Sequence, residues 1–151
     1  MQTRRETLQR SAVVASLLAS SGLFPQYAQA FDKVAFDAKT MAEAVKAMGG
    51  SAPVESKEVT ITGPDIAENG AVVPLVVGTS LSQVKRVLLL VEKNPAPLVA
   101  MFNVSPDVEA TFSTRTKMGQ SSDVYAVAIT QDGKAFFAKK DVKVTLGGCG
   151  G

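Results

Sequence analysis

The chain alternates apolar and polar residues over most of its length beyond residue 50, and many of the apolar positions carry β-branched side chains. Alternation with a period of two is typical of strands that turn one face to a core and the other to water. Turn-forming residues such as Gly63-Pro64-Asp65 and Asp132-Gly133 separate the alternating segments. The pattern predicts seven strands, at residues 57–62, 72–77, 84–92, 98–104, 108–116, 122–130 and 135–146.

The segment before these strands has a different period. Residues 37–48 place apolar side chains at helical spacing, with Asp37 or Thr40 available to cap the start and Gly49-Gly50 to end the helix. We expect its apolar stripe to pack in the core: Met41, Val45 and Met48. One short helix followed by seven short strands predicts an all-β fold, an immunoglobulin-like β-sandwich with a short N-terminal helix.

Two of the expected strands, 72–77 and 84–92, contain runs that are apolar on both faces. A strand of a two-layer sandwich normally shows one face to water, so something must cover the second face. The N-terminal helix or a long loop is one candidate cover, and a partner subunit is the other. In the second case Val73, Leu75, Leu88 and Leu90 are candidate partner contacts. Pro74 indicates an edge strand or a bulge.

The first thirty residues have the order of an export signal. A basic start with Arg4 and Arg5 precedes an apolar stretch, and the small residues Ala28 and Ala30 then form a cleavage site. The apolar stretch is too short to span a membrane comfortably. Thr3-Arg4-Arg5 resembles a twin-arginine signal, which exports folded proteins, although Thr7 stands where a bulky Phe is usual. We expect a signal peptide at 1–30, a sandwich domain at 31–146 and a periplasmic location.

The composition of the chain excludes several classes of function. Hydrophobic residues make up 46% of the chain and charged residues 20%, which is typical of a folded domain. The net charge of +2 lies in the leader and the remaining 13 basic and 13 acidic residues cancel, so nucleic-acid binding is not indicated. The chain has no His and one Cys. This excludes Ser-His-Asp, Cys-His and His-metal sites and an internal disulfide, so we expect neither an enzyme nor a metal site.

The side chain best suited to covalent chemistry lies in the final segment, residues 147–151. It consists of Gly147, Gly148, Cys149, Gly150 and Gly151. Glycine loses the most backbone entropy on folding, and this segment has no side chain whose burial would compensate, so it predicts a flexible arm. The arm can carry Cys149 roughly 10 Å from Leu146 and is thin enough to enter a narrow cleft.

A lone cysteine in an exported protein indicates either an intermolecular bond or a reactive thiol. Neither a His nor a helix start is present to activate Cys149, and a resolving cysteine is missing, so a redox enzyme is disfavoured. The pattern favours a covalent carrier, whose cargo is processed by the proteins that receive the arm. The alternative is an assembly module that uses Cys149 for a disulfide between chains. Lys139, Lys140 and Lys143 either guide anions to the arm or, more simply, form a solvated edge.

The terminal Gly147-Gly148-Cys149-Gly150-Gly151, the twin-arginine-type leader and the β-rich body together resemble the SoxY family, the sulfur carriers of the periplasmic Sox system. The resemblance implies an immunoglobulin-like sandwich that pairs with a smaller β-sandwich subunit, SoxZ. It also implies that a c-type cytochrome, SoxAX, joins thiosulfate to Cys149 and that the hydrolase SoxB then releases sulfate and leaves a persulfide. A sulfur dehydrogenase is a further candidate partner. The implied cofactor is only the covalently bound sulfur on Cys149.

Overall fold

The computed structural model describes residues 33–145. The chain divides between Phe31 and Asp32, so all described residues belong to one unit. The predicted signal peptide, with Arg4, Arg5, Ala28 and Ala30, and the predicted arm at 147–151 lie outside the described residues. The helices are α2 (Lys33–Asp37) and α3 (Met41–Ala47). The strands are β1 (Val54–Glu55), β2 (Val59–Thr62), β3 (Ile66–Ala67), β4 (Val73–Thr79), β5 (Val84–Val91), β6 (Leu98–Asn103), β7 (Thr111–Thr116), β8 (Ser122–Thr130) and β9 (Ala135–Val144).

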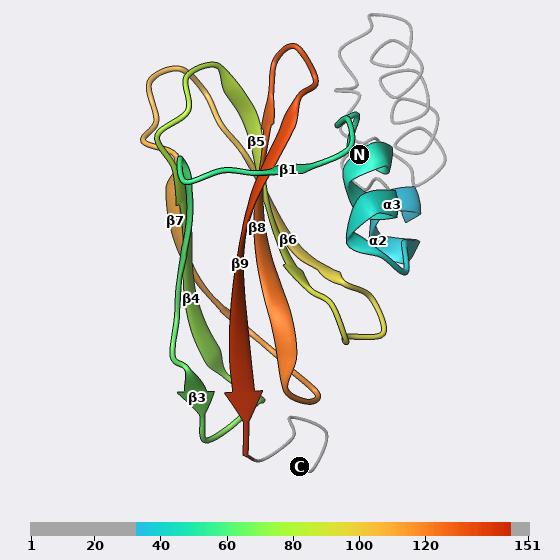
Figure 1. Cartoon of the computed structure of the whole chain (residues 1–151), viewed down its shortest axis with the longest axis vertical. Coiled ribbons are helices and arrows are strands. Elements are labelled where there is room, and N and C mark those ends of the chain that lie inside the picture. Colours follow the sequence, from blue (N-terminus) through green and yellow to red (C-terminus); the bar gives the residue numbers. More distant parts are fainter. Residues whose placement is uncertain (1–32, 146–151) are drawn as a thin grey trace, which may run out of the picture. The chain divides into compact units, whose positions relative to one another are not determined.

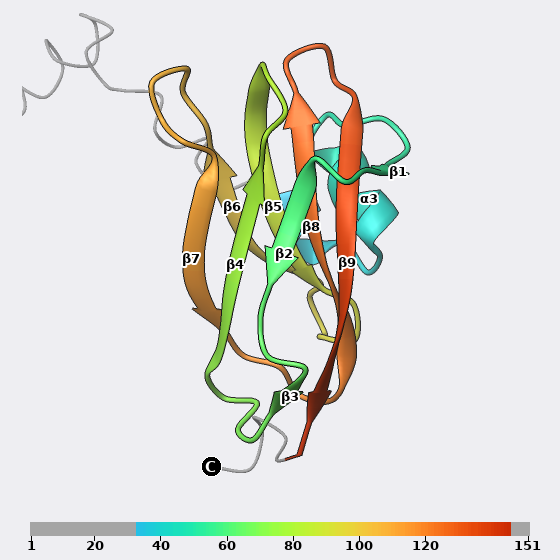
Figure 2. The ribbon, with the colours of Figure 1, turned by 60° about the vertical axis from the view of Figure 1, so that its left-hand side comes forward.

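Two sheets face each other, as Figures 1 and 2 show. The larger has the order β1-β9-β8-β5-β6, with β3 also paired to β9, and the smaller has the order β2-β4-β7. Long strands pair antiparallel, whereas the two-residue strands β1 and β3 run parallel to β9. The immunoglobulin-like β-sandwich expected from the alternation is therefore confirmed.

The space between the sheets is filled by alternate residues of the long strands. From the smaller sheet, Val73, Leu75 and Val77 of β4 point inward, and from the larger sheet Val87 and Leu89 of β5 meet them. Alternate positions of a strand share one face, so the period of two in the sequence is the pattern of this core. The stacked rings of Phe102 and Phe112, 4.4 Å apart, add a contact between β6 and β7 across the two sheets.

A second core lies on the outer face of the larger sheet, where α2 and α3 cover it (Figure 1). The other alternate residues of β5, Leu88 and Leu90, pack there against buried Val45 and Met48. Thr40 caps α3 by accepting a hydrogen bond from the Glu43 backbone N–H at 3.2 Å, as the sequence suggests. The apolar stripe of the helix therefore packs in the core, as expected.

The doubly apolar run of β5 is thus explained without a partner. Leu88 and Leu90 are fully buried by the helices, and Val73 and Leu75 are buried between the sheets. Of the two alternatives left open by the sequence, the one in which these four residues contact a partner subunit is wrong, because none of them reaches the surface. Alternation with a period of two does not show whether a helix or a partner covers the second face of a strand. Here the helices cover it.

Pro74 occupies an unexpected place. Its strand, β4, is the middle strand of the smaller sheet and not an edge strand. However, β2 pairs with β4 only from Val76 to Thr79, so Pro74 lies beyond the end of β2 and opposite Arg115 of β7 alone. A proline lacks the N–H that a second neighbour would require, and at this position no second strand is paired. The local environment is that of an edge.

All seven strands expected from the alternation are present, with ends that differ by a few residues. The sequence did not predict β1, β3 and α2. Two-residue strands and a five-residue helix are too short to establish a period, so hydrophobic patterning carries no signal for them.

Replacing Leu88 by alanine tests the origin of the second core. Leu88 is fully buried, so Leu88→Ala should lower the free energy of unfolding by about 2–5 kcal/mol. Chemical denaturation of the mature domain measures this loss. Val54→Ala, at an exposed β1 position, is the control and should change stability by less than about 0.5 kcal/mol. A stable Leu88→Ala protein that fails to assemble with a partner would contradict the assignment of this face to the helices.

Candidate functional site

Cys149 and its four flanking glycines lie outside the described residues, so the described part of the site is the strand that leads to them. We call residues 142–145 the arm root. Residues 142–144 form the end of β9, and Thr145, which follows the strand, is the last described residue. What holds the arm root fixes the point from which the predicted arm at 147–151 would start.

One side of the arm root is held by the segment that contains β3. The Lys143 backbone N–H donates to the Asp65 carbonyl at 2.9 Å, and the Thr145 N–H donates to the Ala67 carbonyl at 3.1 Å. The Thr145 hydroxyl also donates to the Glu68 carbonyl at 3.0 Å. This side chain fixes the same residue whose backbone is already bonded, so Thr145 is attached to β3 twice.

The other side is held by the start of β8. Val142 pairs with Ser122 and is fully buried. Beyond this pair, the Val144 backbone N–H donates to the Ser121 hydroxyl oxygen at 2.9 Å. The serine side chain thus continues the ladder past the end of β8, and a hydroxyl can act in this way because it both donates and accepts. With partners on both sides, β9 is an inner strand up to its end at Val144, and Thr145 is bonded on the β3 side.

The neighbouring connections at this end of the sandwich are bonded to one another. The Met118 backbone N–H donates to the Gly70 carbonyl at 2.7 Å, and the Met118 side chain is fully buried. The Asn94 side-chain amide donates to the Lys117 carbonyl at 2.8 Å. The segments around the arm root therefore support each other as well as β9.

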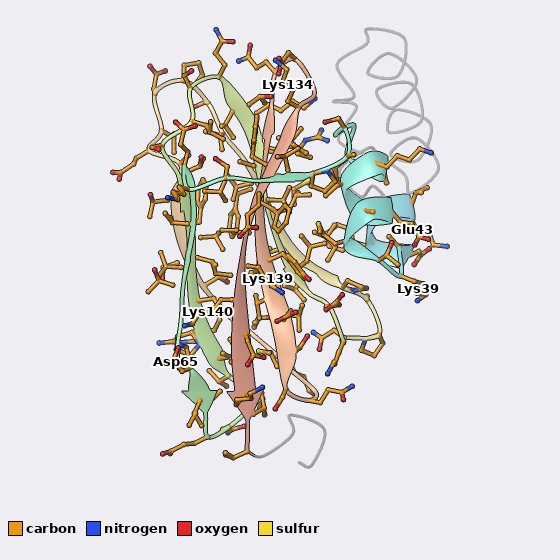
Figure 3. All side chains as sticks on the ribbon, in the orientation of Figure 1. Lys39, Glu43, Asp65, Lys134, Lys139 and Lys140 are labelled. Carbon is orange, nitrogen blue, oxygen red and sulfur yellow. The ribbon has the colours of Figure 1, made fainter. Side chains whose placement is uncertain are left out.

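The lysines on β9 are paired with carboxylates. Figure 3 shows Lys140 beside Asp65 at the edge of the sheet. The three ion pairs are Lys139–Asp123 at 3.3 Å, Lys140–Asp65 at 2.5 Å and Lys143–Asp141 at 2.8 Å.

The ion pairs also change proton affinities. The hydrogen bond from Lys140, followed by its charge, lowers the pKa of Asp65, and the carboxylate of Asp141 raises the pKa of Lys143. Each of the three lysines therefore faces a nearby negative charge. Local neutralisation argues against a role in guiding anions and favours the interpretation of these lysines as a solvated edge.

Within residues 33–145, no three His, Cys, Asp or Glu side chains gather in a group able to hold a metal ion. A hollow of about 470 Å³, lined by residues that include Gln83, Ser105 and Gln131, lies at the opposite end of the sandwich. Among the helices that the structure describes, none is long and apolar enough to cross a membrane.

Comparison with known proteins agrees with this geometry. The sequence model of the family described as "Sulfur oxidation protein SoxY" matches residues 44–149, so the match ends at Cys149. The chain is similar to the sulfur carrier protein SoxY from Chlorobium limicola f thiosulfatophilum, with 36% identity and a TM-score of 0.62, over 69% of this chain and 94% of that chain. A search of curated proteins found no match.

A superoxide reductase (neelaredoxin) from Ignicoccus hospitalis is also similar, with 16% identity and a TM-score of 0.51, over 57% of this chain and 79% of that chain. This likeness shows the fold alone. The fold and the anchored last strand define an immunoglobulin-like β-sandwich protein whose lone thiol follows a fixed strand end. Within that class, the chain belongs to the SoxY family. Membership agrees with the expectation that the chain is not an enzyme.

Sequence reasoning missed the residues that anchor the arm. Ser121 was not singled out, although it bonds Val144 across 23 positions of the chain, and Glu68 bonds Thr145 across 77 positions. The Gly-Pro-Asp turn at 63–65 was recognised, but the two-residue strand that follows it was not. A short alternating segment directly after a turn is the one signal that could have found β3.

Removing the Ser121 hydroxyl should loosen the arm root. Ser121→Ala leaves the Val144 N–H without its partner, and a net hydrogen-bond contribution of about 1 kcal/mol corresponds to roughly fivefold faster amide exchange. Hydrogen exchange followed by NMR measures the Val144 amide directly. Ser122→Ala is the control, because its hydroxyl accepts from the Lys93 N–H and the loss should appear there. Unchanged exchange at Val144 in Ser121→Ala would show that the ladder ends before this residue.

The Lys140–Asp65 pair can be tested by titration. Lys140→Gln removes the charge of Lys140 and weakens its hydrogen bond to Asp65. Both of these lower the pKa of Asp65 in the wild type, so this pKa should rise toward the ordinary value of 3.8. A carboxylate whose pKa is lowered in the folded state stabilises the fold fully when the pH is above its ordinary pKa. This stabilisation is lost as the pH falls through the lowered pKa. NMR of the Asp65 carboxyl carbon follows the shift. An identical titration curve in the variant would mean that the pair does not persist in solution.

Proposed function

We propose that this protein is a covalent sulfur carrier that holds thiosulfate-derived sulfur on Cys149 and presents it to the enzymes of a sulfur-oxidation pathway. The observation that carries the proposal is the family match, which runs to Cys149, the only cysteine of the chain. Because the chain has one cysteine, any sulfur bonded to a thiol of this protein must be bonded there. Gly147, Gly148, Gly150 and Gly151 leave the thiol without bulky neighbours.

The proposed chemistry has two steps. The thiol and thiosulfate join with the loss of one proton and two electrons, which gives a cysteine S-thiosulfonate with one negative charge. A c-type cytochrome of the SoxAX kind accepts the electrons. Water then cleaves the bond between the outer sulfur atoms in a SoxB-like hydrolase, which releases sulfate and a proton and leaves a persulfide on Cys149. A sulfur dehydrogenase is a candidate for the oxidation of that persulfide.

The described residues support a division of labour between the carrier and these enzymes. The chain contains no His, and the lysines of β9 are paired with Asp65, Asp123 and Asp141. Thiol attack requires the thiolate, which positive charge or a general base favours. With neither in reach on β9, activation of the thiol falls to the protein that receives the arm.

Partners and location follow from the same family. A smaller SoxZ-like β-sandwich subunit forms a heterodimer with this chain, and the pair works in the periplasm. Export in the folded state through the twin-arginine pathway, directed by Arg4 and Arg5 with cleavage after Ala30, fits a carrier that leaves the cytoplasm together with a partner that has no signal of its own.

Substitution of the thiol tests the proposal. Cys149→Ser should abolish thiosulfate-dependent oxygen uptake, because an oxygen atom cannot form the disulfide-like bond to the outer sulfur. Thermal unfolding should match wild type, since residue 149 follows the last strand. Normal thiosulfate oxidation by a Cys149→Ser strain would refute the carrier role. If the wild type carries no sulfur adducts and Cys149→Ser loses both a covalent homodimer and the activity, the alternative of a disulfide-linked assembly module would be favoured instead.

The glycines provide a second prediction. Gly148→Val places a β-branched side chain next to the thiol, which stiffens and thickens the arm. We expect slower sulfur transfer, by roughly tenfold, because entry to a narrow cleft requires an exact fit over the last residues. Single-turnover transfer measures the effect, and the denaturation curve should be unchanged. Transfer at the wild-type rate would count against the requirement for a thin arm.

A further inference from the structure

We propose that the end of the sandwich beside the arm root binds directly to the enzyme that acts on the sulfur of Cys149. The contact centres on Ile66 and Val72, and the partner is an enzyme surface with apolar side chains at the mouth of its active-site cleft. This inference rests on the carrier function proposed above and adds the surface that the carrier uses.

The length of the tether requires such a contact. The arm root is held from both sides: Thr145 donates hydrogen bonds to the Ala67 and Glu68 carbonyls, and Val144 donates one to Ser121. The arm therefore starts at a fixed point, and four residues extend at most about 14 Å to Cys149 at about 3.3–3.6 Å per residue. The rim of any cleft that Cys149 enters therefore lies within about 14 Å of Thr145, which brings the enzyme surface close to the residues around Thr145.

Two apolar side chains are exposed at this place. Ile66 is 61% and Val72 is 54% exposed, and they belong to the segment 66–72, whose carbonyls accept hydrogen bonds from Thr145 and Met118. Five large apolar side chains of the described residues are exposed: Val34, Val54, Ile66, Val72 and Val108. Two of the five thus lie on the short connection that holds the arm root. Figure 1 shows this connection between β3 and β4 beside the end of β9.

The surroundings of these side chains favour an apolar contact over an electrostatic one. Ile66 is in register with Lys143, whose charge is balanced by Asp141 at 2.8 Å, and the preceding Asp65 is balanced by Lys140. Neutral pairs beside an exposed β-branched side chain lower the cost of removing water from it, because no unpaired charge is buried with it. A small apolar contact with a paired polar rim is typical of a transient interface.

The connection is also fixed in place before an enzyme binds. Val72 donates its backbone N–H to the Asn69 carbonyl at 3.4 Å, and the Asn69 side chain accepts from the Ala71 N–H at 2.8 Å. Ala67, next to Ile66, is buried in the core between the sheets. A surface that is ordered beforehand loses little entropy on association. The same hydrogen bonds therefore position both the start of the arm and the contact surface.

Substitution of these residues in the intact carrier tests the proposal. The mature chain, in complex with its smaller subunit, is loaded with tetrathionate, which transfers an S–SO₃⁻ group to the Cys149 thiolate and releases thiosulfate. A SoxB-like hydrolase is the probe, and sulfate release is measured against carrier concentration. Val72→Asp should raise KM about fivefold or more and leave kcat within about twofold, because it weakens encounter and not the cleavage step. Ile66→Thr, which keeps a β-branched residue in β3, should raise KM in the same direction.

Two controls isolate the surface. Val108→Asp makes the same change at a valine that is 49% exposed, on the connection between β6 and β7 at the opposite end of the sandwich, and should leave KM unchanged. A synthetic peptide of residues 144–151, loaded in the same way, lacks the surface and should show the high KM without any of the substitutions.

The outcomes separate this proposal from the carrier function. Wild-type KM in both Val72→Asp and Ile66→Thr, or equal KM for the peptide and the intact carrier, would overturn the docking surface and leave the carrier function intact. Loss of the smaller subunit from the variants on size exclusion would assign the surface to the subunit interface and also overturn the proposal. If sulfate is not released even from loaded wild-type protein, the proposed function itself fails.

Discussion

The pairing of the last strand on both sides is the constraint on which the site depends. Hydrogen bonds from Thr145 to the β3 segment and from Val144 to Ser121 keep β9 paired to its end at Val144 and hold Thr145, the last described residue. Without them, the strand end would fray. With them, the chain continues toward Cys149 from a defined position, and the segment 66–72 is fixed by the same bonds.

The larger sheet is buried on both faces over much of β5 and β8. Leu89 faces the smaller sheet, while Leu88 and Ile129 face the helices. Each additional buried apolar face adds to stability roughly in proportion to the area removed from water. The helical layer thus stabilises the strands next to β9.

The sequence predicted the features that repeat or that are compositionally rare. Alternation located the seven longer strands, helical spacing located α3, and a single cysteine among four glycines indicated the carrier chemistry. It could not show what covers the second face of β5, so Leu88 and Leu90 were left open between the N-terminal helix and a partner, and they face the helices. Nor could it show the bonds of Ser121 and Glu68, because contacts between distant positions leave no local pattern.

The central claim is that Cys149 carries sulfur, and the intact mass of the exported protein tests it most directly. Protein isolated from cells that oxidise thiosulfate should show sulfur-containing mass additions that a reductant removes. Fragmentation should place them on Cys149, and Cys149→Ser should show none. Only free thiol on protein from actively oxidising cells, with thiosulfate still consumed in a Cys149→Ser strain, would contradict the account.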